Sequence, residues 1–80
     1  MKGGYRLRTL MIERRKQLSL TQEEVSKIIG VSRSTYTSYE TGAINPSLDV
    51  AIRIKKALRT NDDNIFLINK VTNCDEVYTA

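Results

Sequence analysis

The 80-residue sequence lacks several of the residues on which enzyme and metal sites depend. It contains no histidine and no tryptophan, one cysteine (Cys74) and one proline (Pro46). A single cysteine cannot form a disulfide within the chain. Without histidine, the ordinary zinc sites and the Ser-His or Cys-His nucleophilic pairs are excluded. We therefore expect no metal and no other cofactor, and the sequence indicates that the protein is not an enzyme.

Long hydrophobic runs are also absent. No apolar run approaches the roughly 18 residues needed to cross a membrane, and the start MKGGYRLRTL lacks the apolar block of a signal peptide. We expect a cytoplasmic protein that has no membrane partner. A length of 80 residues indicates one small domain, and 40% apolar with 28% charged residues is typical of globular proteins. Because the sequence shows no sensor domain, no small-molecule ligand is expected.

Acidic residues are scarce in two parts of the chain. Residues 1–20 contain six Lys or Arg and one Glu, and residues 41–60 contain four Lys or Arg and one Asp, whereas residues 61–80 contain four acids and one Lys. An uneven distribution of this kind hints at a face that binds nucleic acid. A solvated helix surface explains the charge alone equally well.

Helical periodicity runs through most of the chain and predicts four main helices. The first extends from about Tyr5 to Gln17. The second begins at the capping box Thr21-Gln22-Glu23-Glu24, in which Thr21 and Glu24 satisfy each other's backbone N–H groups, and it ends at Gly30. The third occupies about 32–41, and the fourth follows a cap at Ser47.

A short fifth helix is predicted after a cap in Thr60–Asp63, and helical periodicity is lost from Val71. We therefore expect an all-α, compact bundle of four to five short helices in residues 1–70, with a C-terminal tail in residues 71–80 and no β-hairpin. The apolar residues expected to face inward from the first, second and fourth helices are Leu7, Leu10, Met11, Leu18, Val25, Ile28, Ile29, Leu48, Ala51, Ile52 and Leu58.

The third predicted helix has an unusual composition, because its first residues, SRSTYTS, are mostly hydroxyl side chains without an acid. Ser and Thr are mediocre helix formers. Tyr36 and Tyr39 lie three residues apart and are expected to face inward. The opposite face suits close approach to DNA, since hydroxyls contact several base edges and arginine contacts guanine. That face consists of Arg33, Ser34, Thr37, Ser38 and Thr41.

The second and third helices, joined at Gly30-Val31-Ser32, form a helix-turn-helix unit. The stretch from Leu18 to Leu58, with TQEEVSKIIGVSRSTYTSYETG at its centre, resembles the lambda-repressor/Cro (Xre-type) helix-turn-helix family. The resemblance implies a lambda repressor-like DNA-binding fold. Two positions depart from the family, because Ser26 and Lys55 stand where alanine is usual.

The resemblance implies the roles of individual residues. Helix three would lie in the major groove, and its base-reading residues would be Arg33, Ser34, Thr37 and Ser38. Gln22 would bind a phosphate and brace the start of helix three, and an ion pair would join Arg15 to Glu40. The residues expected at phosphates are Gln22, Thr21, Tyr36, Thr41 and Asn45.

The implied function is that of a sequence-specific DNA-binding transcriptional regulator, a repressor of bacterial or phage type. Its partner would be a double-stranded, palindromic operator bound by a homodimer. The possible dimer contact is the apolar block Ile65, Phe66, Leu67 and Ile68, and Val77-Tyr78 could add a strand or clasp. Two alternatives remain open: an antitoxin that also binds its own operator, and a protein-interaction adaptor that keeps the fold.

Overall fold

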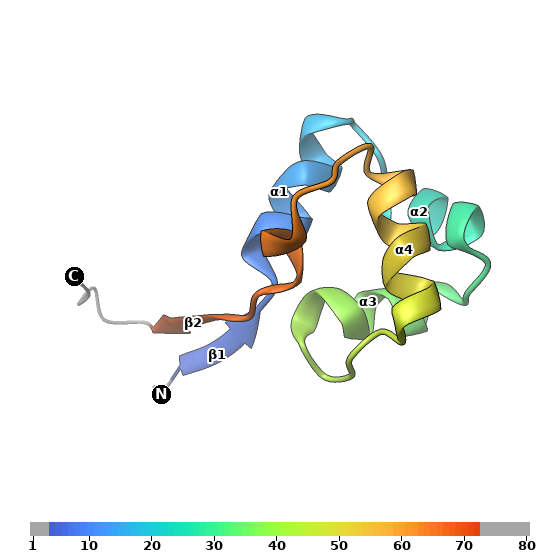
Figure 1. Cartoon of the computed structure of the whole chain (residues 1–80). Helices are drawn as coiled ribbons and strands as arrows, with labels where there is room; N and C mark the ends of the chain where they lie inside the picture. The colour runs from blue at the N-terminus through green and yellow to red at the C-terminus, as the bar shows by residue number, and fades with distance from the viewer. Residues whose placement is uncertain (1–3, 73–80) are drawn as a thin grey trace.

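The computed structural model describes the backbone of residues 4–72 and the side chains of residues 7–69. Its elements, in chain order, are β1 (Gly4–Leu7), α1 (Thr9–Gln17), α2 (Gln22–Ile29), α3 (Arg33–Thr41), α4 (Leu48–Ala57), the 3₁₀ turn η1 (Asp63–Phe66) and β2 (Asn69–Thr72). The four helices form the body of the molecule, and the two strands project from it as a narrow ribbon (Figure 1). The helical body confirms the all-α class.

The caps of α2, α3 and α4 are those that the sequence predicts. Both hydrogen bonds of the capping box between Thr21 and Glu24 are present. The side chain of Ser32 accepts from the backbone N–H of Thr35, and that of Ser47 accepts from Val50. Glycine ends both α2 and α3, and their φ angles of 80° and 79° are left-handed, a conformation in which a Cβ is strained.

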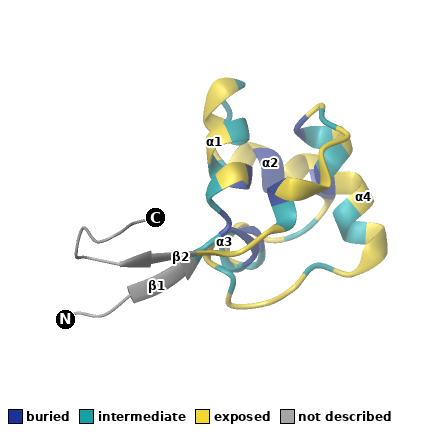
Figure 2. Ribbon diagram, turned by 60° about the vertical axis from the view of Figure 1, so that its left-hand side comes forward, coloured by how far each residue is buried: buried dark blue, intermediate teal, exposed yellow. Residues whose placement is uncertain are grey.

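The core lies where the four helices and η1 meet, and Figure 2 shows the buried parts of α2 and α3 in the middle of the body. On α4 the predicted inward stripe is correct at Leu58, which is buried, but it is wrong at Leu48 and Ile52, which are 80% and 46% exposed. The inward stripe instead consists of residues at helical spacing, namely Val50, Ile54, Ala57 and Leu58. Ile28 of α2 is also exposed, at 59%. The buried apolar residues are Met11, Val25, Ile29, Tyr36, Tyr39, Ile54, Leu58 and Ile65.

The ribbon is a feature that the sequence analysis does not predict. β1 and β2 pair antiparallel, and their register matches Leu7 with Asn69 and Gly4 with Thr72. The expected helical start at Tyr5 is wrong, because the backbone N–H of Arg8 donates to the carbonyl of Glu40 at 2.8 Å. This bond draws the chain toward α3 before α1 begins. Strands of four residues from the two ends of a chain leave no hairpin signal in its sequence.

The predicted fifth helix is reduced to η1. Its N-cap is Asp62, whose side chain accepts from the N–H of Asn64 at 2.9 Å, and Thr60 in turn accepts from the N–H of Asp62. Leu67 already has extended backbone angles. β2 continues two residues past the domain boundary predicted at residue 70. The strand or clasp suggested at Val77-Tyr78 lies outside the described residues.

None of the helices in residues 4–72 is long and apolar enough to cross a membrane. In the same part of the chain, His, Cys, Asp and Glu side chains form no group of three or more that could hold a metal ion.

Candidate nucleic-acid interface

The outward face of α3 is polar and has no exposed acid. Arg33, Ser34 and Thr41 are exposed, and Thr37 and Ser38 are half-buried. The one acidic residue of α3, Glu40, is buried. The structure therefore brings all four candidate base-reading residues onto one helix, together with Thr41. Side chains this short allow the backbone of α3 to approach another surface closely.

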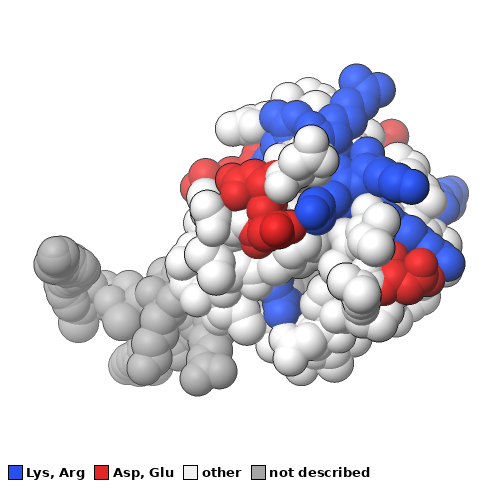
Figure 3. Space-filling view, viewed as in Figure 1, with Lys and Arg blue, Asp and Glu red and all other residues white. Residues whose placement is uncertain are grey.

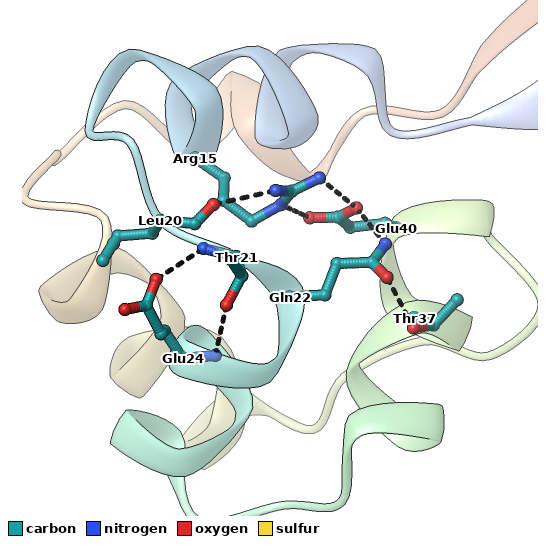
Figure 4. A network of polar contacts seen from close by, with 7 residues as sticks. All are labelled: Arg15, Leu20, Thr21, Gln22, Glu24, Thr37 and Glu40. Atoms are coloured by element: carbon teal, nitrogen blue, oxygen red, sulfur yellow. Dashed lines mark hydrogen bonds and ion pairs between the residues drawn. The ribbon is translucent and has the colours of Figure 1, made fainter.

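A network of polar contacts fixes α3 relative to α1 and α2 (Figure 4). Arg15 Nε lies 2.6 Å from Glu40 Oε2, and Arg15 Nη1 donates to the carbonyl of Leu20 at 2.9 Å. Burial acts to lower the pKa of the Arg15 guanidinium, but the hydrogen bond and charge of Glu40 outweigh it and raise that pKa above its ordinary value. This ion pair joins α1 to the end of α3, as the resemblance implies.

Gln22 is the central residue of the network. Its Nε2 donates to Glu40 Oε1 at 2.9 Å, and its Oε1 accepts from the hydroxyl of Thr37 at 3.1 Å. Gln22 therefore braces the middle and the end of α3, and the expectation that it braces the start is wrong. Both of its partners on α3, Thr37 and Glu40, lie beyond the first turn of that helix.

Three of the residues expected to contact DNA line one hollow beside the first turn of α2. Thr21 contributes as the N-cap of α2, Gln22 as its first residue, and Arg33 from the start of α3. Thr21 is exposed, and its oxygen already accepts from the N–H of Glu24 at 3.0 Å. Its hydroxyl proton is therefore available to donate to an anion. The other lining residues are Arg15, Ser19, Leu20 and Glu23.

The structure contradicts a phosphate contact by Tyr36. The side chain is completely buried, and within the described residues its hydroxyl oxygen has no hydrogen-bond partner. Burial raises the pKa of the Tyr36 hydroxyl above its ordinary value of 10.0, and the nearby Glu40 carboxylate acts in the same direction. A hydroxyl in this position cannot reach DNA, so Tyr36 belongs to the core with Tyr39.

Sequence reasoning missed Arg8, which holds the loop after α3. Its guanidinium donates to the carbonyls of Tyr39, Ile44 and Phe66, and to Asn45 Oδ1 at 2.6 Å. The residue is only 3% exposed, and burial lowers the pKa of its guanidinium. A guanidinium has no acceptor, so the Asn45 side chain presents its oxygen to Arg8 and its NH₂ group to solvent. No sequence signal distinguishes Arg8 from the other cations nearby.

The two departures from the family pattern are both accommodated. Ser26 lies on the buried side of α2, and its hydroxyl donates to the carbonyl of Glu23 at 2.7 Å. Lys55 extends from α4 to η1, where its Nζ lies 2.6 Å from Asp63 Oδ1. Neither residue disturbs the arrangement of α2 and α3.

The apolar block suggested as a dimer contact is divided by the fold. Ile65 is buried in the core and Phe66 is half-buried. Leu67 is 55% exposed and Ile68 is 37% exposed. Half of the block therefore closes the domain, and the other half lies on the surface next to the ribbon.

Positive charge gathers away from α3 on the face shown in Figure 3, over the C-terminal ends of α1 and α4. Both helices have basic residues in their last turns, and Arg59 follows α4. Arg14 joins the two ends, because it donates to the carbonyls of Leu58 and Arg59, each at 2.8 Å. Cations at helix C-termini are favoured by the helix dipole.

Comparisons with known proteins agree with this arrangement. A family model described as helix-turn-helix matches residues 11–65. The chain is 45% identical over 65 residues to an uncharacterized HTH-type transcriptional regulator of Methanothermobacter thermautotrophicus, which covers 80% of this chain and 94% of the relative. A regulator with the same description from Archaeoglobus fulgidus is 36% identical over 64 residues, covering 80% and 90%.

A phage protein is also similar. The cryptic phage CTXphi transcriptional repressor RstR of Vibrio cholerae is 39% identical over 51 residues, which cover 64% of this chain and 42% of that protein. No solved structure matches the chain significantly.

Proposed function

The chain belongs to the lambda-repressor/Cro type of helix-turn-helix transcriptional regulators, which bind DNA and are not enzymes, and from this premise we propose that it represses transcription by placing α3 in the major groove of an operator. Bound there, it would exclude RNA polymerase from the same DNA. The repressor role is supported by the similarity to RstR, which is a phage repressor.

The outward face of α3 is the observation on which the proposal rests. Arg33 lies at the start of the helix, where it can make a bidentate contact to guanine. Ser34, Thr37 and Ser38 follow on the same side, and Glu40 is withdrawn into the core by Arg15. Because the only acid of α3 is buried, the outward face carries no negative charge that would repel DNA phosphates. The face is therefore compatible with a groove lined by phosphates.

The phosphate contacts that we propose come from the elements on either side of α3. On one side, Thr21 and Gln22 have a hydroxyl proton and an amide proton that no internal bond uses. On the other side, the NH₂ group of Asn45 points outward because Arg8 holds the oxygen. Thr41 completes the set with an exposed hydroxyl. These contacts would fix the position of α3, and base contacts would select the sequence.

We further propose that the protein binds a palindromic operator as a homodimer. One short helix reads too few base pairs for a unique site, so two-fold pairs of half-sites are usual. The exposed part of the apolar block, Leu67 and Ile68, is the contact that we assign to the partner copy. Sedimentation equilibrium should show association that Leu67→Asp weakens. Leu48→Asp is the matched control, because Leu48 is exposed elsewhere; equal effects of the two would contradict the assignment.

Selection of bound duplexes from random DNA tests the central proposal, followed by binding titrations at several salt concentrations. Arg33→Ala should cost about 1–3 kcal/mol on the selected site and little on random DNA. Asn45→Asp keeps the acceptor for Arg8 but replaces a donor by a negative charge, so it should weaken both DNAs alike. Selection that yields no consensus, or affinity that does not fall with salt, would overturn the proposal.

A further inference from the structure

The buried ion pair determines which way the Gln22 amide points. Glu40 accepts from Arg15 Nε at 2.6 Å and from Arg15 Nη2 at 3.3 Å, so its carboxylate acts as an acceptor. An acceptor must face the NH₂ end of an amide. Gln22 therefore presents Nε2 to Glu40 at 2.9 Å, and its oxygen is turned toward α3.

This orientation uses the only proton of the Thr37 hydroxyl. Gln22 Oε1 carries no hydrogen, so across the 3.1 Å contact the hydroxyl of Thr37 is the donor (Figure 4). A threonine hydroxyl has one proton and two lone pairs. Only its lone pairs remain for any group that approaches the half-buried Thr37 from outside.

The other hydroxyls of α3 are not constrained in this way. Ser38 donates to the carbonyl of Ser34 at 3.1 Å, and Thr41 donates to the carbonyl of Ser38 at 3.3 Å. Both acceptors are backbone carbonyls of the same helix, and both hydroxyls can rotate toward a different acceptor. The acceptor of Thr37, by contrast, is a side chain held by a buried ion pair.

We propose that Thr37 is an acceptor-only reader, which selects a base with an exocyclic amino group at its position in the operator. Resting on the proposed function, this inference adds the class of base that is recognised. In the major groove adenine presents N6–H₂ and cytosine presents N4–H₂, whereas guanine O6 and thymine O4 are acceptors. The lone pairs of Thr37 would accept a hydrogen bond from adenine or cytosine, whereas they would repel the acceptor oxygens of guanine and thymine.

The experiment compares the wild-type protein with Thr37→Val, which keeps the shape and removes the hydroxyl, and with Thr37→Ser, which keeps the hydroxyl. In selected DNA, the wild type should require adenine or cytosine at one position of each half-site, and only Thr37→Val should lose that requirement. In the wild type's best site, the amino group is then removed by placing purine for adenine, or 2-pyrimidinone for cytosine. Wild type and Thr37→Ser should lose about tenfold in affinity, the scale of one hydrogen bond to a buried partner. Thr37→Val should lose less than about twofold on the same estimate.

A second variant tests the orientation itself. Gln22→Met removes the acceptor at similar volume and releases the Thr37 proton. Overall binding should weaken, but guanine or thymine should become tolerated at the same position. The same base analogue placed at each other adenine or cytosine is the control.

The inference is overturned if the wild type prefers guanine or thymine at the position that Thr37→Val affects, or if Thr37→Val alters no position. It is also overturned if Gln22→Met keeps the strict preference. These results would leave the proposed function intact. The proposed function fails on other results, namely selection by the wild-type protein that yields no consensus, or affinity that does not fall with salt.

Discussion

The helical body has two polar regions, one on the outward face of α3 and one where α1 and α4 finish, and they are built differently. On α3 the outward side chains are short, and one of them, Thr37, is fixed by the network of Arg15, Glu40 and Gln22. Where α1 and α4 finish (Figure 1), the exposed side chains include the long cations Lys16, Lys56 and Arg59. The first region carries short hydrogen-bonding groups, whereas in the second Arg14 satisfies the carbonyls of Leu58 and Arg59 at the end of α4.

The ends of the helices differ in the same way. α2 and α3 end on left-handed glycines, whereas the left-handed residues after α1 and α4 are Ser19, with φ of 58°, and Arg59, with φ of 54°. A side chain in this conformation is strained. If α3 binds DNA as proposed, positive charge does not mark that surface, because six of the thirteen Lys and Arg residues lie in the last turns of α1 and α4 or directly after α4.

The largest expected effect comes from breaking the network at Arg15. Arg15→Ala leaves the buried carboxylate of Glu40 without its counter-charge, and loss of one partner of a buried pair costs about 3–5 kcal/mol. We expect a loss of this size in the free energy of unfolding, measured by urea denaturation. Lys27→Ala, which breaks the exposed pair with Glu23, should cost less than about 1 kcal/mol. Similar losses for the two variants would contradict the fixed network.

Removing positive charge should reduce operator affinity when the cation lies on α3, but not when it lies where α4 finishes. The double variant Lys56→Gln, Arg59→Gln should keep operator affinity within about twofold and leave its salt dependence unchanged, because these cations lie at the end away from α3. Arg33→Gln removes one cation at α3 and should cost about 1–3 kcal/mol on the operator. Fluorescence anisotropy at several salt concentrations measures both. A larger loss in the double variant would show that the far end faces DNA.

The buried hydroxyl of Tyr36 makes stability sensitive to alkaline pH. Because the pKa of Tyr36 is raised above its ordinary 10.0 in the folded protein, the unfolded chain releases this proton first as the pH rises above that value. The contribution is present below pH 10 and is lost above it, with a slope of up to about 1.4 kcal/mol per pH unit. Tyr36→Phe should remove this part of the pH dependence. Parallel curves for the two proteins between pH 9 and 11.5 would contradict it.

The smallest expected effect concerns the helix ends. Ser19→Gly should stabilise the protein by about 0.5–1 kcal/mol, because glycine relieves the left-handed strain after α1. Gly42→Ala introduces the same strain after α3 and should destabilise by about 1–2 kcal/mol. Thermal unfolding of both variants measures the difference. If both variants raise the unfolding temperature, or both lower it, the ends of α1 and α3 are not built differently.

The sequence predicts the α2–α3 end better than the rest, and the reason is physical. Capping boxes and C-terminal glycines act over three or four residues, so Thr21, Gly30 and Gly42 mark their helix ends directly. The position of α1 depends instead on Arg8, whose backbone bonds Glu40 and whose side chain holds Asn45. Contacts of this length leave no local pattern.

The errors on the inward faces have a similar origin. On α4, Leu48 and Ile52 share one stripe, and Val50 and Ile54 share another. The spacing of apolar residues permits either stripe to face the core, and packing against α2 decides. Tyr36 was correctly assigned to the core, but the depth that excludes its hydroxyl from DNA depends on Glu40 and Arg15 around it.

Replacing single guanines of the selected operator by 7-deazaguanine tests most directly whether α3 reads the major groove. This base lacks N7, an acceptor that only the major groove exposes, and it leaves Watson–Crick pairing intact. We predict that one substitution per half-site weakens binding of the wild-type protein and has no effect on Arg33→Ala. If the wild type binds every 7-deazaguanine operator as tightly as the natural one, Arg33 and α3 do not read guanine in the major groove, and the central claim is contradicted.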